Sequence, residues 1–146
     1  MMTESHEQPK AVEDTVRSAV KKTEGGWRID LAETGLTEEI MKTVSQIYIV
    51  ACGSAWHVGM AAQYIFEDLA RIPVRVDLAS EFRYRKPILD PNGLVIVISQ
   101  SGETADSLAA LRDAKDLGVR TVAIVTVVGS SVARRAGHAC HTLAGP

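Results

Sequence analysis

The sequence predicts an α/β fold: a flavodoxin-like, doubly wound sheet of five parallel strands, preceded by a helical lead-in. From residue 46 onward, short apolar runs rich in Val and Ile alternate with longer segments of helical pattern. Runs such as 47–51 and 94–98 are apolar throughout rather than at every second residue, which is typical of strands buried on both faces. The length of 146 residues suits one domain of this class with a sizeable core.

Residues 1–45 form the predicted lead-in, which we expect to pack on the main domain of residues 46–146. Three valines spaced four residues apart place an apolar stripe along residues 8–22. This segment is therefore predicted to be a helix, and the glycine pair at 25–26 breaks it. A second, short helix is expected to begin at Thr37, because threonine is a good N-cap and two glutamates follow it.

The main domain is predicted to alternate between strands and helices. Strands are expected at residues 47–51, 74–78, 94–98, 121–125 and 139–143, and helices at residues 55–70, 104–117 and 131–136. Gly118 is well placed to cap the end of the middle helix. This alternation implies right-handed crossovers, and five strands suggest the spatial order 2-1-3-4-5.

The predicted strand order selects one edge of the sheet as the ligand site. In open parallel sheets, ligands bind beyond the carboxyl ends of the strands, where the winding reverses. For this order, that point lies between the first and third strands. The loops there, residues 52–55 and 99–104, are both rich in glycine and small hydroxyl residues. Topology and chemistry therefore indicate the same place.

The loop Ser99-Gln100-Ser101-Gly102-Glu103-Thr104 has the composition of a phosphate cradle. It joins a buried strand to a helix, and the first backbone N–H groups of a helix favour a bound anion. Its hydroxyl groups are short neutral donors, and its glycine lets the backbone approach a ligand closely. The alternative is a simple strand-to-helix turn, which needs one hydroxyl group whereas this loop has three.

Other classes of ligand lack their sequence signals. No strand is followed by G-x-G-x-x-G, and no G-K-[ST] occurs, so neither a dinucleotide site nor a nucleotide P-loop is expected. The net charge of −2 without a basic block indicates neither nucleic acid nor a membrane surface as a partner. The apolar runs are too short to span a membrane, and two distant cysteines suit a reduced, cytoplasmic protein.

Two residues near the first strand have open roles. Cys52 is interpreted as a small buried residue at the strand end rather than as a nucleophile, because Val58 stands where a cysteine phosphatase of this fold needs arginine. His57 lies in the first turn of the following helix, where proton transfer is conceivable. We favour a partly buried histidine that is bonded to a neighbour.

Three further features are weighed in the same way. Glu103 is interpreted as a base, as an acceptor for a ligand hydroxyl group, or, our preference, as a charge that favours the helix N-terminus. A metal site at residues 138–141 is discounted, because side chains on a short strand alternate between its faces. The charged and aromatic cluster at residues 81–86 is expected to be a solvated turn or a subunit contact.

Four segments together resemble the first sugar-isomerase (SIS) domain of the glutamine–fructose-6-phosphate aminotransferase family, also called glucosamine-6-phosphate synthase. They are Ile49–Gly53, Leu78–Arg85, Ser99–Asp106 and Val128–Ser131, in that order. The likeness runs from about residue 6 to the last residue. The serine loop alone would indicate only the broad SIS superfamily, whereas its combination with the second segment is much more specific.

The resemblance implies a site without a metal, an organic cofactor or an assigned catalytic residue in this chain. The implied phosphate-binding residues are Ser99, Gln100, Ser101 and Thr104, with Gly53, Ser54, Gly102 and Glu103 as secondary candidates. The implied ligand is fructose 6-phosphate or glucosamine 6-phosphate. The implied setting is a homodimer in cytoplasmic amino-sugar synthesis.

This chain departs from the family in two respects. The family usually reads Cys-Gly-Thr-Ser after the first strand, where this chain has Ser54 and Ala55 as the last two residues. The hydroxyl group missing at Ala55 would weaken phosphate binding by about 0.5–3 kcal/mol. Nothing in the chain resembles the family's glutaminase domain or its second SIS domain, which supplies the acid–base carboxylate and the imine-forming lysine. We therefore expect the chain to be inactive alone.

Two alternatives remain open beside this reading. One is a stand-alone module that senses a sugar phosphate and signals to a partner. The other is a one-domain aldose–ketose isomerase completed by dimerisation, with His57 or Glu103 as its base.

Overall fold

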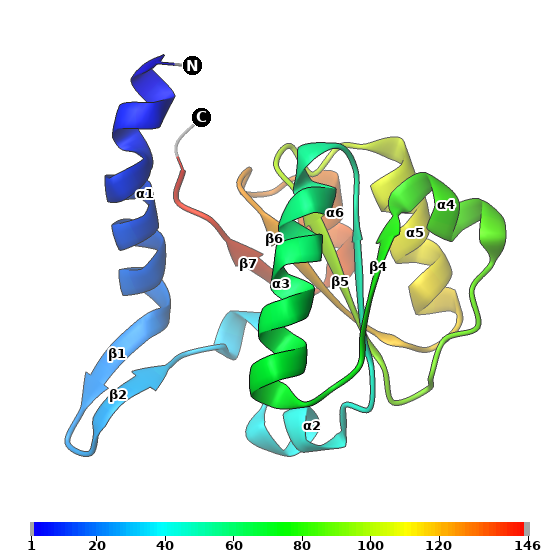
Figure 1. The fold of residues 1–146 in the computed structure, drawn as a ribbon, viewed down its shortest axis with the longest axis horizontal. Helices are drawn as coiled ribbons and strands as arrows, with labels where there is room; N and C mark the ends of the chain where they lie inside the picture. Colours follow the sequence, from blue (N-terminus) through cyan, green and yellow to red (C-terminus); the bar gives the residue numbers. More distant parts are fainter. Residues whose placement is uncertain (1, 145–146) are drawn as a thin grey trace.

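The main domain is a five-stranded parallel sheet with helices on both faces (Figure 1). The computed structural model describes residues 2–144, so Met1 and the last two residues of the predicted main domain lie outside the described residues. The strands are β3 (Ile47–Ala51), β4 (Val74–Leu78), β5 (Leu94–Ser99), β6 (Arg120–Val125) and β7 (Ala139–His141). Their spatial order, β4-β3-β5-β6-β7, is the order 2-1-3-4-5 and confirms the predicted fold class.

The two faces of the sheet have separate apolar cores, because neighbouring strand residues point to opposite faces. Ile47 and Ile49 of β3 belong to the core beneath α3 (Ser54–Ala70), whereas Tyr48 and Val50 belong to the other core. The second core is covered by α4 (Ala79–Arg85), α5 (Ala105–Asp116) and α6 (Ser131–Ala136). No helix among residues 2–144 is long and apolar enough to cross a membrane.

The lead-in contains a β-hairpin that the sequence analysis missed. Its elements are α1 (Met2–Ala19), β1 (Val20–Thr23), β2 (Gly26–Ile29), the 3₁₀ turn η1 (Ala32–Thr34) and α2 (Glu38–Thr43). The predicted helix over 8–22 is wrong at both ends, since the helix runs from residue 2 to residue 19. β-branched residues at 20 and 23 favour a strand, and the glycine pair permits the hairpin turn. Thr37 caps α2 as predicted, accepting a hydrogen bond from the Ile40 N–H.

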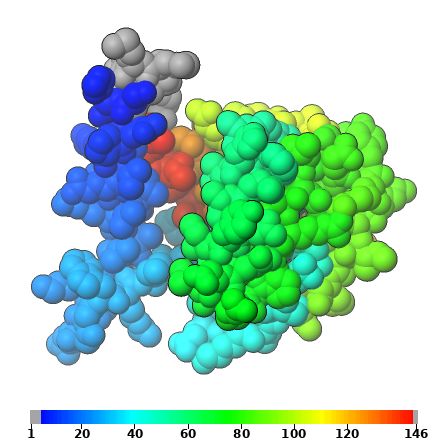
Figure 2. Space-filling model, in the orientation of Figure 1, coloured from blue at the N-terminus to red at the C-terminus, as the bar shows by residue number. Residues whose placement is uncertain are grey.

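Helix α1 and the hairpin extend beside the main domain as an arm (Figures 1 and 2). Thr15 of α1 connects the arm to the main domain, because its Oγ1 accepts a hydrogen bond from the Leu143 N–H at 2.8 Å. Val12 and Val16 of α1 and Trp27 of β2 are exposed. The arm therefore carries apolar side chains on its outer surface.

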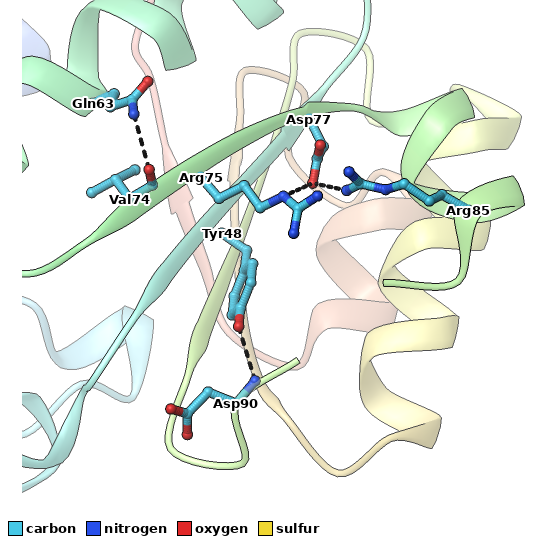
Figure 3. A network of polar contacts seen from close by, with 7 residues as sticks. All are labelled: Tyr48, Gln63, Val74, Arg75, Asp77, Arg85 and Asp90. Atoms are coloured by element: carbon cyan, nitrogen blue, oxygen red, sulfur yellow. Dashed lines mark hydrogen bonds and ion pairs between the residues drawn. The ribbon is translucent and has the colours of Figure 1, made fainter. Parts of the chain in front are cut away.

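The cluster at residues 81–86 is mostly helical, which corrects the expectation of a solvated turn. Phe82 of α4 is only 1% exposed and packs in the core beneath that helix. The Asp77 carboxylate of β4 accepts hydrogen bonds or ion pairs from Arg75 at 3.3 Å and from Arg85 at 2.7 Å, so it ties α4 to the strand before it (Figure 3). The Tyr48 hydroxyl oxygen accepts a hydrogen bond from the Asp90 N–H and fixes the loop that follows α4.

Side chains of α3 bind the first residue of the edge strand β4. The Gln63 amide donates to the Val74 carbonyl at 3.0 Å, and the Glu67 carboxylate accepts from the Val74 N–H at 3.0 Å (Figure 3 draws the first of these). Both backbone groups of Val74 are thus paired with the helix that covers this face.

The contribution of α4 to stability is testable at a single buried side chain. Phe82→Ala is expected to lower the free energy of unfolding by about 3–5 kcal/mol, because it leaves a cavity in the core. The matched control on the same helix is Tyr84→Ala, whose side chain is exposed, with an expected loss below about 1 kcal/mol. Urea unfolding measures both; equal losses would contradict the anchoring role of Phe82.

Candidate functional site

The predicted site residues lie together at the carboxyl edge of the sheet. Register pairs Ala51 of β3 with Ile98 of β5, and Ser99 of β5 with Val125 of β6, so the three strands end almost level. The loops after them, at residues 52–53, 100–104 and 126–130, meet at this edge. The serine loop, defined here as residues 99–104, is the middle one of the three.

Two hydroxyl groups of the serine loop shape its backbone. Ser99 is buried, and its Oγ accepts a hydrogen bond from the Gly102 N–H at 3.0 Å. Ser101 is exposed, and its Oγ accepts from the Glu103 N–H at 3.3 Å. Because each oxygen acts as an acceptor in these bonds, each hydroxyl hydrogen remains available for donation to an anion.

The N-terminus of α5 presents backbone donors. Thr104 is its N-cap residue, and the threonine side chain makes no capping hydrogen bond. The first backbone bond of the helix runs from Leu108 to Thr104, and no residue in 2–144 accepts from the three N–H groups before it. These groups belong to Ala105, Asp106 and Ser107. This end of α5 therefore has unpaired donors and a partial positive charge.

The neighbouring helix α6 begins at the same edge, but its N-terminal N–H groups already have acceptors. Its first three N–H groups, at Ser131, Val132 and Ala133, are all paired. The acceptors are, in that order, the Glu103 carboxylate at 2.7 Å, the Gly102 carbonyl at 2.9 Å and the Ser130 hydroxyl at 3.4 Å. Between the N-termini of α5 and α6, that of α5 presents unpaired first-turn donors and that of α6 does not.

Glu103 interacts with a helix N-terminus, as preferred, but the helix is α6 rather than α5. Hydrogen bonds from the Ser131 N–H and side chain lower the pKa of its carboxyl group, and the positive charge of Arg134 adds to the effect. A lowered pKa means that the contact stabilises the fold above the ordinary value of 4.5 and is lost as pH falls through the lowered pKa.

The loop after β3 brings small residues to this edge of the sheet, and the expected burial of His57 is corrected there. Gly53 and Ser54 are exposed at the start of α3, and Cys52 is half-buried with its Sγ 3.7 Å from the buried Ser107 hydroxyl. His57 is exposed rather than partly buried, and its ring meets the edge of Trp56 at a centroid distance of 5.0 Å. The expectation of partial burial was wrong because the His57 side chain, in the first turn of α3, points to solvent and not into the core.

Two residues that lie at this edge of the sheet, Arg83 and Ser130, were not predicted from the sequence. Arg83 of α4 reaches Asp106 in the first turn of α5 at 3.4 Å, so a cation from a distant segment lies at this edge. Ser130 packs against the serine loop so closely that a Cβ atom on Gly102 would lie 2.1 Å from its Oγ. Tertiary packing brings both residues here. The only sequence signals were the family segments that contain them.

The fold is that of a sugar-isomerase domain. The family model described as the SIS domain matches residues 40–146, so the chain belongs to the SIS family.

Curated relatives extend the identification. The chain is 53% identical over 146 residues to glutamine–fructose-6-phosphate aminotransferase (isomerizing) of Clostridium acetobutylicum, and 45% identical to that of Streptomyces coelicolor. All of this chain is covered in each case, but only 24% and 23% of the relatives. The chain thus spans about a quarter of their length. The resemblance inferred from the four sequence segments is confirmed.

A solved structure agrees with the sequence relatives. The C-terminal domain of glucosamine-fructose-6-phosphate aminotransferase from Francisella tularensis matches with a TM-score of 0.87 and 38% identity. The match covers 100% of this chain and 40% of that one. The sugar isomerase domain of an RpiR transcription factor from Sphaerobacter thermophilus, with a TM-score of 0.71 and 19% identity, shares the fold.

The close contact between Gly102 and Ser130 is testable with a pair of glycines. Both Gly102 and Gly118 have a left-handed backbone, with φ of +64° and +74°. A Cβ atom on Gly118 would meet nothing within 4 Å. Gly118→Ala is therefore expected to cost about 1–2 kcal/mol from backbone strain alone. Gly102→Ala should cost about 1–3 kcal/mol more, since Ser130 must move. Thermal and urea unfolding measure the difference, and equal costs would refute the contact.

Proposed function

We propose that this SIS domain binds the phosphate group of a sugar phosphate at the N-terminus of α5. The ligand is fructose 6-phosphate or glucosamine 6-phosphate, and the setting is glucosamine 6-phosphate synthesis in the cytoplasm. The observation that carries the proposal is the contrast between the unpaired first-turn donors of α5 and the paired ones of α6. The names of the relatives supply the sugar.

Each residue of the proposed site has a distinct task. The N–H groups at the start of α5 donate hydrogen bonds to the phosphate oxygens, as helix N-termini do for anions generally. Side-chain donors to the phosphate come from three residues that are at least partly exposed: Gln100, Ser101 and Thr104. Ser99 is buried, and its hydroxyl oxygen fixes the loop by accepting from the Gly102 N–H. Gly53 and Ser54 border the same edge from α3. The Arg83 guanidinium pairs with the Asp106 carboxylate and so offsets the negative charge in the first turn of α5.

The proposal assigns this chain binding rather than turnover. Isomerisation needs a base at the sugar carbons, and the Glu103 carboxylate is held by the N-terminus of α6. Its lowered pKa also makes it a weaker base than an ordinary glutamate. His57 is the remaining candidate of the one-domain isomerase alternative. A coupled assay for aldose–ketose exchange tests that alternative. Binding without turnover is the result expected both of this proposal and of the sensor alternative.

Calorimetry tests the proposed ligand. We expect saturable binding of fructose 6-phosphate to the full chain and much weaker heats with inorganic phosphate or free fructose. Ser101→Ala should weaken binding about 3- to 30-fold, the effect of losing one hydrogen bond to an anion. The matched control is Ser5→Ala, a serine of the lead-in, which should leave the affinity unchanged. Absence of binding at millimolar sugar phosphate, or equal affinity in Ser101→Ala, would contradict the proposal.

We propose further that the chain forms a homodimer through the outer face of α3. Val58, Ile65 and Leu69 recur on one side of this helix and are all exposed, and Tyr64 lies beside them. Figure 2 shows α3 on the outer surface of the domain, turned toward the viewer. An apolar helix face of this kind is unusual on a monomer, and two copies would bury it against each other.

Sedimentation equilibrium tests the dimer. Leu69→Asp, which places a charge where the side chain is 77% exposed, is expected to convert dimers to monomers at micromolar concentration. The matched control is Ile88→Asp, in the loop after α4, where the side chain is 94% exposed and the dimer should persist. A wild-type chain that sediments as a monomer at all concentrations would overturn the proposal.

A further inference from the structure

The serine loop contains a carboxylate next to a proposed phosphate site, which is unfavourable unless the carboxylate faces elsewhere. Two like charges within a few ångströms repel each other, and a glutamate in a phosphate loop would weaken binding. In the structure, the Glu103 carboxylate binds the N-terminus of α6. Its Oε1 accepts from the Ser131 N–H at 2.7 Å, and the charge of Arg134 lies on that side.

This contact is one of four hydrogen bonds that backbone N–H groups of the segment after β6 donate to the serine loop. The Gln100 carbonyl accepts from the N–H groups of Thr126 and Val127, each at 3.3 Å. The Gly102 carbonyl accepts from Val132 at 2.9 Å. The Glu103 contact is the only one of the four in which a side chain of the serine loop takes part, so substitution can remove it without altering the backbone.

We infer that Glu103 is a positioning residue for anion binding: its carboxylate occupies the first N–H of α6, locks the serine loop to residues 126–132 and leaves α5 as the anion-accepting helix end. The inference rests on the proposed phosphate site and deepens it. It explains why a loop of neutral donors carries an acid, and it assigns Glu103 no contact with the ligand. Its lowered pKa keeps it charged at neutral pH.

The partner of Glu103 is a backbone group that one substitution removes. Ser131 is the first residue of α6, the helix position where proline is best tolerated because its N–H has no partner within the helix. Ser131→Pro therefore deletes the donor and is compatible with the helix. Ser131→Ala removes the hydroxyl group, which also bonds Glu103, and keeps the N–H, so it isolates the part of the contact that the hydroxyl group makes.

A double-mutant cycle on the full chain tests the inference by calorimetry with fructose 6-phosphate. Glu103→Ala and Ser131→Pro are each expected to weaken binding about tenfold, as for loss of one charge-assisted hydrogen bond. The double variant should also be about tenfold weaker, not a hundredfold, because both changes remove the same contact. Asp116→Ala, which removes one charge at the far end of α5, should stay within about twofold of wild type, and Ser131→Ala should weaken binding less than Ser131→Pro does.

Amide hydrogen exchange gives a readout that needs no ligand. Glu103→Ala should speed exchange at the Ser131 N–H and at the Gly102 N–H, while Asp116→Ala should not. Wild-type affinity in Glu103→Ala, or multiplying effects in the double variant, would overturn the inference. If the unchanged chain binds no sugar phosphate, the proposed function fails. The inference is then decided by exchange alone: unchanged protection at Ser131 overturns it.

Discussion

The parallel pairing of β5 with β3 on one side and β6 on the other is the interaction on which the site depends. It places three strand ends level with one another, and it delivers Ser99, still buried, to the point where the backbone leaves the sheet. Both faces of β5 are covered, so a one-residue shift of this strand would turn its apolar side chains toward the wrong core. The rigidity of the sheet thus fixes where the serine loop starts.

The N-termini of α5 and α6 carry the same kind of donor but use it differently. One set of N–H groups is bonded within the protein, and the other is free for a ligand. The first N–H groups of α6 are paired by groups from the serine loop and by the serine before the helix. Those of α5 have no such partners among the described residues. A loop without lysine can therefore still lie beside a partial positive charge at the start of α5, where Arg83 offsets the charge of Asp106.

Sequence reasoning predicted the sheet because each strand is a continuous apolar run, a signal that needs no tertiary information. It failed at 20–22, where a helical stripe continued into residues that pair across a hairpin, and at α4, which has just two buried side chains, Ala79 and Phe82. The serine loop was predicted from its composition. Its contact with α6 was not, because the residues involved are 28 positions apart and meet only after β6 has been added to the sheet.

The hydrogen bonds between α3 and Val74 affect whether the edge strand β4 can pair with another chain. An edge strand normally offers its backbone groups to any passing extended chain, and such pairing leads to fibrils. Here Gln63 and Glu67 already hold both groups where β4 begins. Thr15 of the arm does the same for the Leu143 N–H just beyond β7, at the opposite border. Side chains of the chain itself thus occupy backbone groups at the start of β4 and just beyond β7, which disfavours the addition of a further strand at these two points.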